Sequence, residues 1–388
     1  MTTTCRLLPS LAALAACTSS SPATATVQLA AQPGWNGTSQ VFVHTPSGAL
    51  VSQAQITSSL AVDIDDGDEV TIVLVGGGLT QVFSNVGIER GDVIEVSAEP
   101  VGTLVATTVA VDMPSVPGAT MWEVGTSYDT NAGAVASSVT TNVPPGTTAM
   151  PIIATAYDDT GALAMFAETS APITGGQAPA VTLHDQIGFR SITVDTTGLP
   201  TGATQADVSP YGVVFLGDAA LELTQLGTDS IVPIGFGDYI SIAATAFGTA
   251  ETVTAGQVGA GMPTDTVSID LSAPDLPQIS ALALSPSQAS WTLAGGASYD
   301  YISVDLWASS NTSYTYTVMA PAGTSALPFM QLPAELAPPP FDSFSVAATE
   351  ISNVEGYADA LRDPDALFRG GSFEVRSASV PVTDVVRR

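Results

Sequence analysis

Short runs of alternating apolar and polar residues recur along the chain from about Val27 onward. Clusters of Gly, Pro, Asp and Asn separate these runs at a spacing of roughly ten residues, which is typical of β-sandwiches and barrels. The 27 prolines, scattered through the sequence, argue against long helices. We therefore predict an all-β fold, with brief helices only at 356–361 and 364–368. Representative strands are expected at 40–44, 70–75, 93–96, 191–194 and 239–242.

Two weak internal repeats indicate that one structural unit recurs. The segment 238–245, Asp-Tyr-Ile-Ser-Ile-Ala-Ala-Thr, returns at 342–349 as Asp-Ser-Phe-Ser-Val-Ala-Ala-Thr. Its core also resembles 152–157, and 67–72 is a plausible fourth copy. A second element, Val-Ala-Val-Asp at 109–112, reappears as Ile-Thr-Val-Asp at 192–195. In every copy alternating apolar residues follow a turn, so each copy is predicted to be a strand.

The offsets between copies are about 80 to 105 residues, which is the size of one sandwich domain. This phase predicts four β-sandwich domains, at 26–99, 100–185, 186–273 and 274–386. The clearest linker between them is the proline-containing segment 272–277, Ser-Ala-Pro-Asp-Leu-Pro.

The last of these domains carries the most recognisable pattern. Trp291 lies in a predicted strand, two alternating strands follow at 301–306 and 314–318, and Leu327-Pro328 precedes a strand at 344–348. This order resembles a fibronectin type III or immunoglobulin-like sandwich. The resemblance implies tandem antiparallel β-sandwich domains, with Trp291 buried on the second strand of the last one.

The N-terminus contains Arg6, an apolar stretch at 7–16, and then Leu14-Ala15-Ala16-Cys17. The apolar stretch is too short to span a bilayer as a helix. The pattern resembles the lipobox of bacterial lipoprotein signal peptides. The resemblance implies that residues 1–16 are removed, that Cys17 becomes the lipid attachment site, and that 17–25 forms a tether to the membrane. The alternative is an ordinary secretory signal with an incidental cysteine.

The residue after the cysteine bears on which membrane holds the anchor. Thr18 occupies the position at which enteric lipoproteins of the inner membrane carry an aspartate. We therefore expect a location in the cell envelope, at the outer membrane or cell surface rather than the inner membrane.

The charge balance limits the classes of partner. Eight arginines and no lysine stand against 37 acidic residues, which gives a formal net charge of −29. Nucleic acid binding is excluded, because contacts to phosphates need clustered basic residues. Solubility, adaptation to high salt and cation binding all remain as explanations of the acidity.

Few residues suit catalysis. Cys5 leaves with the signal peptide and Cys17 is the proposed lipid site, so we expect no disulfide. The two histidines, His44 and His184, lack a nucleophile motif or a metal-binding motif around them. The segment 194–198, Val-Asp-Thr-Thr-Gly, departs from the aspartic protease motif by an inserted threonine. We therefore predict a protein that is not an enzyme, although carboxylate-pair glycosidases leave no local signature.

Two alternatives concern ligand binding. Asp63, Asp65, Asp66 and Asp68 surround a glycine and could supply oxygen ligands to Ca²⁺. Their spacing departs from the EF-hand loop, because the glycine is fifth and Leu74 stands at the twelfth position, and a simple turn between two strands explains the same residues. Trp35, in a Pro-Gly-Trp-Asn-Gly segment, is the best candidate for an exposed, sugar-stacking aromatic side chain. No other cofactor is expected.

The functional prediction follows from the expected location in the cell envelope and from the predicted fold. A non-catalytic, lipid-anchored extracytoplasmic protein would act as a surface stalk or as an adhesion or interaction protein, with a protein or polysaccharide as its unidentified partner. An elongated shape with one distinctive terminal domain would favour the stalk. The alternative is a module that binds polysaccharide or Ca²⁺.

Overall fold

The computed structural model describes most of the chain after the N-terminal 22 residues. The described residues are 23–31, 35–98, 105–112, 115–126, 129–133, 138–143, 147–159, 163–177, 180–187, 189–216, 219–223, 230–233, 239–249, 251–259, 266–285, 287–296, 298–308, 314–363 and 370–381. Strands account for nearly all of the regular structure in these residues, which confirms the predicted all-β class. Of the two expected helices, the first is present as α1 (Tyr357–Arg362), and 364–368 lies outside the described residues.

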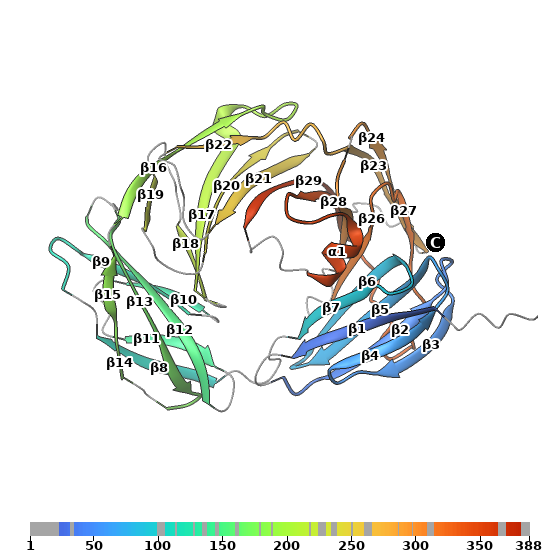
Figure 1. Cartoon of the computed structure of the whole chain (residues 1–388), viewed down its shortest axis with the longest axis horizontal. Helices are drawn as coiled ribbons and strands as arrows, with labels where there is room; N and C mark the ends of the chain where they lie inside the picture. Colours follow the sequence, from blue (N-terminus) through green and yellow to red (C-terminus); the bar gives the residue numbers. More distant parts are fainter. Residues whose placement is uncertain are drawn as a thin grey trace, which may run out of the picture.

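The strands fall into four successive sets, which we call repeats 1 to 4 (Figure 1). Repeat 1 contains β1 (Ala23–Ala31), β2 (Thr38–His44), β3 (Leu50–Gln55), β4 (Ser59–Ile64), β5 (Asp68–Gly76), β6 (Leu79–Ile88) and β7 (Val93–Ala98). Repeat 2 contains β8 (Val105–Asp112), β9 (Met121–Thr126), β10 (Asp129–Gly133), β11 (Ser138–Val143), β12 (Thr147–Tyr157), β13 (Leu163–Thr174) and β14 (Ala180–Thr182), and β15 (His184–Ile187) follows it.

Repeat 3 contains β16 (Phe189–Thr197), the 3₁₀ turn Gln205–Asp207, β17 (Val208–Leu216), β18 (Ala219–Leu223), β19 (Ser230–Pro233), β20 (Tyr239–Phe247), β21 (Thr252–Gly259) and β22 (Thr266–Asp270). Repeat 4 contains β23 (Gln278–Leu284), β24 (Gln288–Ala294), β25 (Tyr301–Trp307), β26 (Tyr314–Pro321), β27 (Ala326–Pro328), β28 (Ser343–Ile351), helix α1 and β29 (Gly371–Pro381). The segments that repeat in the sequence occupy equivalent strands, namely β5, β12, β20 and β28.

Each repeat is a sandwich of a three-stranded sheet and a set of four strands in a second sheet. The three-stranded sheets have the orders β4-β1-β7, β11-β8-β14, β19-β16-β22 and β23-β24-β27. In repeats 1 to 3 the last strand pairs in parallel with the first, as β7 does with β1. Repeat 4 differs, because its first strand, β23, pairs antiparallel with β24. Repeat 4 therefore has the order expected of a fibronectin type III-like sandwich, and Trp291 on β24 is buried, as predicted.

The repeats are not separate domains connected only by linkers. The four-strand sets of repeats 3, 4 and 1 join edge to edge into one sheet of 12 strands, in the order β18-β17-β20-β21-β29-β28-β25-β26-β6-β5-β2-β3. Strand β21 pairs antiparallel with β29, and β26 pairs in parallel with β6. At the β18 end, the sheet contacts β9 and β12 of repeat 2. The chain therefore follows an arc that brings repeat 4 beside repeat 1 (Figure 1).

The core crosses the boundaries between repeats. A single cluster of buried side chains includes Phe42 of repeat 1, Ile153 of repeat 2, Ile242 of repeat 3 and Trp291 of repeat 4. Strand β5 shows why, because the residues from Asp68 to Leu74 are all buried. Its even-numbered side chains face the core of repeat 1, and Val73 on the opposite face joins the shared cluster. Burial of consecutive residues in this way is expected where both faces of a sheet are covered.

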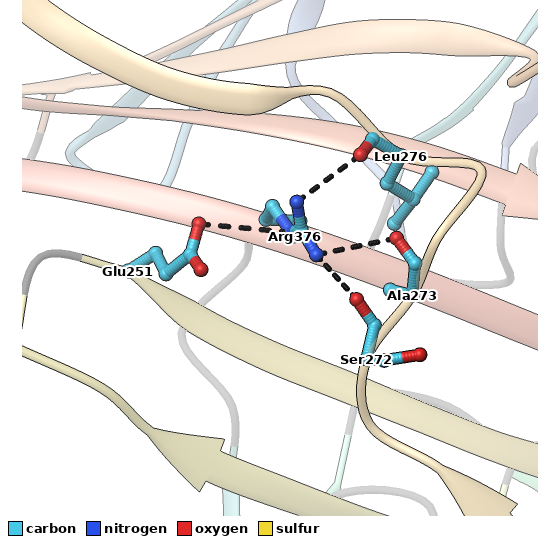
Figure 2. A network of polar contacts seen from close by, with 5 residues as sticks. All are labelled: Glu251, Ser272, Ala273, Leu276 and Arg376. Atoms are coloured by element: carbon cyan, nitrogen blue, oxygen red, sulfur yellow. Dashed lines mark hydrogen bonds and ion pairs between the residues drawn. The ribbon is translucent and has the colours of Figure 1, made fainter. Parts of the chain in front are cut away.

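The segment predicted as the linker between repeats 3 and 4 is held in place by one arginine (Figure 2). Arg376 on β29 is buried and donates hydrogen bonds to the backbone carbonyls of Ser272, Ala273 and Leu276. Its Nε lies 3.6 Å from a carboxylate oxygen of Glu251, which precedes β21. The guanidinium thus supplies a donor to the carbonyls of Ser272 and Leu276, and a second donor to the carbonyl of Ala273, which also accepts the backbone N–H of Leu276. Residues 272–277 are therefore held against repeat 4 and do not form a flexible linker.

We expect the substitution Arg376→Met to destabilise the protein by about 3 kcal/mol, because it removes the donor of the Ser272 and Leu276 carbonyls and the cation beside the largely buried Glu251 carboxylate. Denaturant unfolding measures the loss, and limited proteolysis should show new cleavage near 271–277. The control is Arg362→Met, since Arg362 is exposed and its ion pair in the described part of the chain is with Asp359 on the same helical turn. That change should cost about 0.5 kcal/mol or less. Equal losses in the two variants would contradict the clamping role of Arg376.

Candidate functional site

The four aspartates considered as calcium ligands lie at the turn from β4 to β5. Asp63 is an exposed residue of β4, and Asp65 and Asp66 are exposed in the turn itself. The carboxylate of Asp68 is directed back into the turn, where it accepts the backbone N–H of Asp65 at 2.9 Å. Gly67 has φ 92°, a value that favours glycine. The turn is thus explained by its own hydrogen bonds, and calcium binding stays an untested alternative.

Two further kinds of feature are metal-ligating clusters and membrane-spanning helices. Within the described ranges, no three His, Cys, Asp or Glu side chains lie close enough together to hold a metal ion. The same part of the chain contains no helix that is both long and apolar enough to cross a membrane. Cys17, the predicted lipid attachment site, lies outside the described residues.

The four tryptophans differ in their exposure to solvent. Trp35 is half-buried, and it packs against the core of repeat 1 and over Gly37. Trp122 and Trp291 are buried in cores. Trp307, at the end of β25, is 43% exposed and is the most exposed tryptophan in the described part of the chain. Sequence reasoning missed it because alternation along β25 predicts only that it faces away from Leu306.

A cluster of buried polar side chains joins repeat 1 to repeat 4. His44 Nε2 lies 3.2 Å from the backbone carbonyl of Gln331, and His44 Nδ1 lies 3.5 Å from the Thr71 hydroxyl. Thr71 is 2.8 Å from the Ser84 hydroxyl, which donates to the Tyr316 hydroxyl at 3.2 Å. His44, Thr71 and Ser84 come from three neighbouring strands of repeat 1, and the other two residues come from repeat 4. The four side chains that take part, those of His44, Thr71, Ser84 and Tyr316, are all buried.

Glu69 is the acidic residue of this junction. Only 1% of its surface is exposed, Thr71 donates to its Oε1 at 3.4 Å, and Oε2 has no hydrogen-bond partner among the described residues. Burial raises the pKa of Glu69 to about 8, against the opposing effect of hydrogen bonds from Ser84 and Thr71. Glu69 is therefore a neutral acid at pH 7. Burial raises the pKa of Tyr316, and the negative charge that Glu69 carries once it has ionised at higher pH raises it further.

His44 is likewise kept neutral by its surroundings. Burial lowers its pKa, although the hydrogen bond with Gln331 and the negative charge of Asp68 act in the opposite direction. Neither His44 nor Glu69 was predicted to lie in a shared polar cluster, because no local motif connects them. The junction is a satisfied, largely neutral network inside the protein, and solvent or a substrate would have no direct access to its buried groups.

Next to this network the surface is hollowed. A cavity of about 600 Å³ lies between the β2–β3 turn of repeat 1 and three segments of repeat 4. We call it the repeat 1–repeat 4 pocket. The residues that line it are Ser47, Leu284, Ser285, Ser287, Pro328, Phe329, Met330, Gln331, Pro338, Pro339, Pro340 and Phe341. Its volume falls in the range of small-molecule sites in proteins.

Comparisons with known proteins do not identify a family for this chain. No family model matches the sequence, and no curated protein matches it. Among solved structures, the FN1–FN3 domains of chicken CNTN1 are 10% identical at a TM-score of 0.14, covering 74% of this chain and 90% of that one. The Bacillus anthracis TIE protein is 8% identical at a TM-score of 0.14, covering 83% and 67%. The major pilin T-13 of Streptococcus pyogenes serotype GAS131465 is 8% identical at 0.10, covering 77% and 96%.

At these TM-scores the similarities carry no information about function. The assignment of β-sandwich repeats comes from the strand pairing itself.

We expect the stability of the protein to fall as pH rises from 7 to about 8, because the unfolded chain has already released the Glu69 proton and the folded chain still holds it. The slope should approach about 1 kcal/mol per pH unit and then flatten above pH 8. Glu69→Gln should remove this slope, as measured by denaturant unfolding at pH 7, 8 and 9. His44, whose pKa is lowered in the folded protein, contributes a smaller effect of opposite sign near pH 7, and this effect is common to the wild type and Glu69→Gln. An unchanged slope in Glu69→Gln would contradict the buried neutral acid.

The aspartate turn is tested by thermal unfolding with CaCl₂ or MgCl₂ at constant ionic strength. Since the Asp68 carboxylate is already engaged by the turn, we expect the same melting temperature in the two salts. A rise that calcium alone produces, and that disappears in Asp66→Asn, would establish the calcium alternative.

Proposed function

We propose that this chain is a non-catalytic, lipid-anchored extracytoplasmic protein that acts in adhesion or another surface interaction. One observation carries the proposal: three repeats share a continuous sheet of 12 strands, and one buried cluster includes residues from all four. Strand pairing and a shared core leave no hinge between repeats 1, 3 and 4. A body built in this way holds its surface loops in fixed relative positions, which suits recognition of a partner.

The polar groups support the same proposal. Three buried titratable side chains, Glu69, His44 and Arg376, lie where repeats meet. Two others, Asp68 and Asp300, accept backbone N–H groups of their own repeats. His44 lies within hydrogen-bond distance of a backbone carbonyl of repeat 4, and Arg376 donates to carbonyls of the segment between repeats 3 and 4. Glu69 accepts its hydrogen bond from Thr71 on its own strand. His44 and Arg376 thus tie different parts of the chain together, and a catalytic role would need such groups at an accessible surface.

The arrangement favours an interaction protein over a stalk. The distinctive terminal repeat expected of a stalk is present as repeat 4, but β26 of that repeat pairs with β6 of repeat 1. The chain returns to its first repeat and does not extend over four sandwich lengths (Figure 1). Residues 18–22 separate Cys17 from β1, and five residues span at most about 18 Å. A lipid at Cys17 would therefore hold this body close to the membrane.

The test is to express the wild type, Cys17→Ala and Cys5→Ala in the native host, to fractionate membranes, and to treat intact cells with protease. The proposal expects the wild type and Cys5→Ala in the membrane fraction with an acylated N-terminus. Cys17→Ala should be absent from the membrane fraction, because the other cysteine, Cys5, lies in the signal segment and cannot carry the anchor of the mature protein. External protease should degrade the wild type on intact cells.

Membrane retention of Cys17→Ala would refute the lipid anchor. Resistance to protease until the envelope is opened would refute the surface location and would place the protein inside the envelope, where its partners should then be sought.

A further inference from the structure

We propose that the repeat 1–repeat 4 pocket is a binding site for an uncharged, predominantly apolar small molecule. The proposal stands on the pocket itself and does not depend on the lipid anchor or on a role in adhesion.

The pocket is built from segments that are held in place before any ligand arrives. The backbone N–H of Phe329 donates to the carbonyl of Ser287 at 2.8 Å, and the N–H of Gln331 donates to the carbonyl of Gly48 at 3.2 Å. These two bonds fix the strand that leaves β27 against both the β23–β24 turn and repeat 1. The Tyr314 hydroxyl donates to the carbonyl of Leu336 at 3.0 Å and so anchors the segment that returns toward β28.

The floor of the pocket is aromatic and is also fixed. Phe341 is buried, and its ring centroid lies 5.8 Å from that of Phe329 in an edge-on arrangement. On its other side Phe341 stacks on Tyr316, again at 5.8 Å. Tyr316 in turn accepts the hydrogen bond from Ser84 described above. The floor is therefore supported by the junction between the two repeats, and Pro338 to Pro340 form a wall of low backbone freedom.

The chemistry of the lining determines the class of ligand. None of the described residues that line the pocket is charged, although the chain carries a net charge of −29. Apolar groups come from Leu284, Met330, the two phenylalanines and the prolines, while hydroxyls come from Ser47, Ser285 and Ser287. A charged ligand would find no partner here and would lose its hydration. A ligand with an apolar body and one or two hydrogen-bonding groups facing the serines would fit.

Binding should also strengthen the junction, because the walls belong to two different repeats. A molecule that contacts Ser47 and Phe329 together binds only while repeats 1 and 4 are docked. By linkage, it must raise the stability of the docked state.

The experiment uses the neutral fluorophore N-phenyl-1-naphthylamine as the probe, with fluorescence titration and thermal unfolding of the whole folded chain. The wild type should bind one equivalent with a dissociation constant in the micromolar range, and saturating probe should raise the melting temperature. Ser287→Trp fills the mouth of the pocket at an exposed position, and it should weaken binding about tenfold or more.

Ser58→Trp is the matched control, since it adds the same indole at an exposed turn at the other end of repeat 1. It should bind the probe as the wild type does. A second control, Phe247→Ser, removes an exposed aromatic side chain of repeat 3 and should also leave binding unchanged.

Three results would overturn the proposal. These are no saturable binding by the wild type, binding by Ser287→Trp that equals that of the wild type, and loss of binding in Phe247→Ser, which would show adsorption to exposed apolar surface. Melting of each variant without the probe shows that it is folded.

Discussion

The burial of β5 on both faces is the constraint on which the rest of the structure depends. Most strands of a sandwich hide one face, but residues 68 to 74 are all buried, so repeat 1 cannot expose the outer face of its sheet to water. Repeat 4 covers that face and adds β26 to the adjacent strand, β6. The junction places Glu69 and His44 inside the protein, shifts their pKa values toward neutral side chains, and creates the pocket at its rim. A disturbance at β5 should therefore affect the electrostatics, the repeat packing and the pocket together.

The difference in topology between the first three repeats and the fourth explains how the arc can close. Repeats 1 to 3 complete their small sheets with a final strand parallel to the first, so that each is finished by its own C-terminal segment. In repeat 4 the three-stranded sheet is completed by the N-terminal strand, β23, so the last strand of the repeat, β29, belongs to the large sheet. Strand β29 can then pair with β21 while β26 pairs with β6, and repeat 4 joins repeats 3 and 1 into one sheet. Arg376 lies on this last strand and fixes the connecting segment that the change of topology requires.

Local pattern was enough to predict the strands and the class of fold, because alternation and turn residues act over a few positions. It also placed Trp291 correctly, since the order of strands around it is local to repeat 4. The shared sheet could not be predicted, because β6 and β26 are more than two hundred residues apart and edge pairing leaves no mark in composition. One signal was available: 70–75, Val-Thr-Ile-Val-Leu-Val, is an almost unbroken apolar run and does not alternate. Such a run indicates a strand covered on both faces, but it does not say what covers the second face.

The acidity of the chain makes the manner of joining understandable. With eight arginines, no lysine and 37 acidic residues, the surfaces of the four repeats repel one another, and ion pairs between them are necessarily scarce. Backbone hydrogen bonds across paired edges and buried apolar contacts do not need opposite charges, and they are less sensitive to salt than surface ion pairs. The repeats are joined mainly by these two kinds of contact. One of the few cations, Arg376, supplies donors to the backbone carbonyls of Ser272 and Leu276 in the connecting segment. The uncharged pocket follows from the same requirement, because only neutral segments can meet closely where two acidic repeats are pressed together.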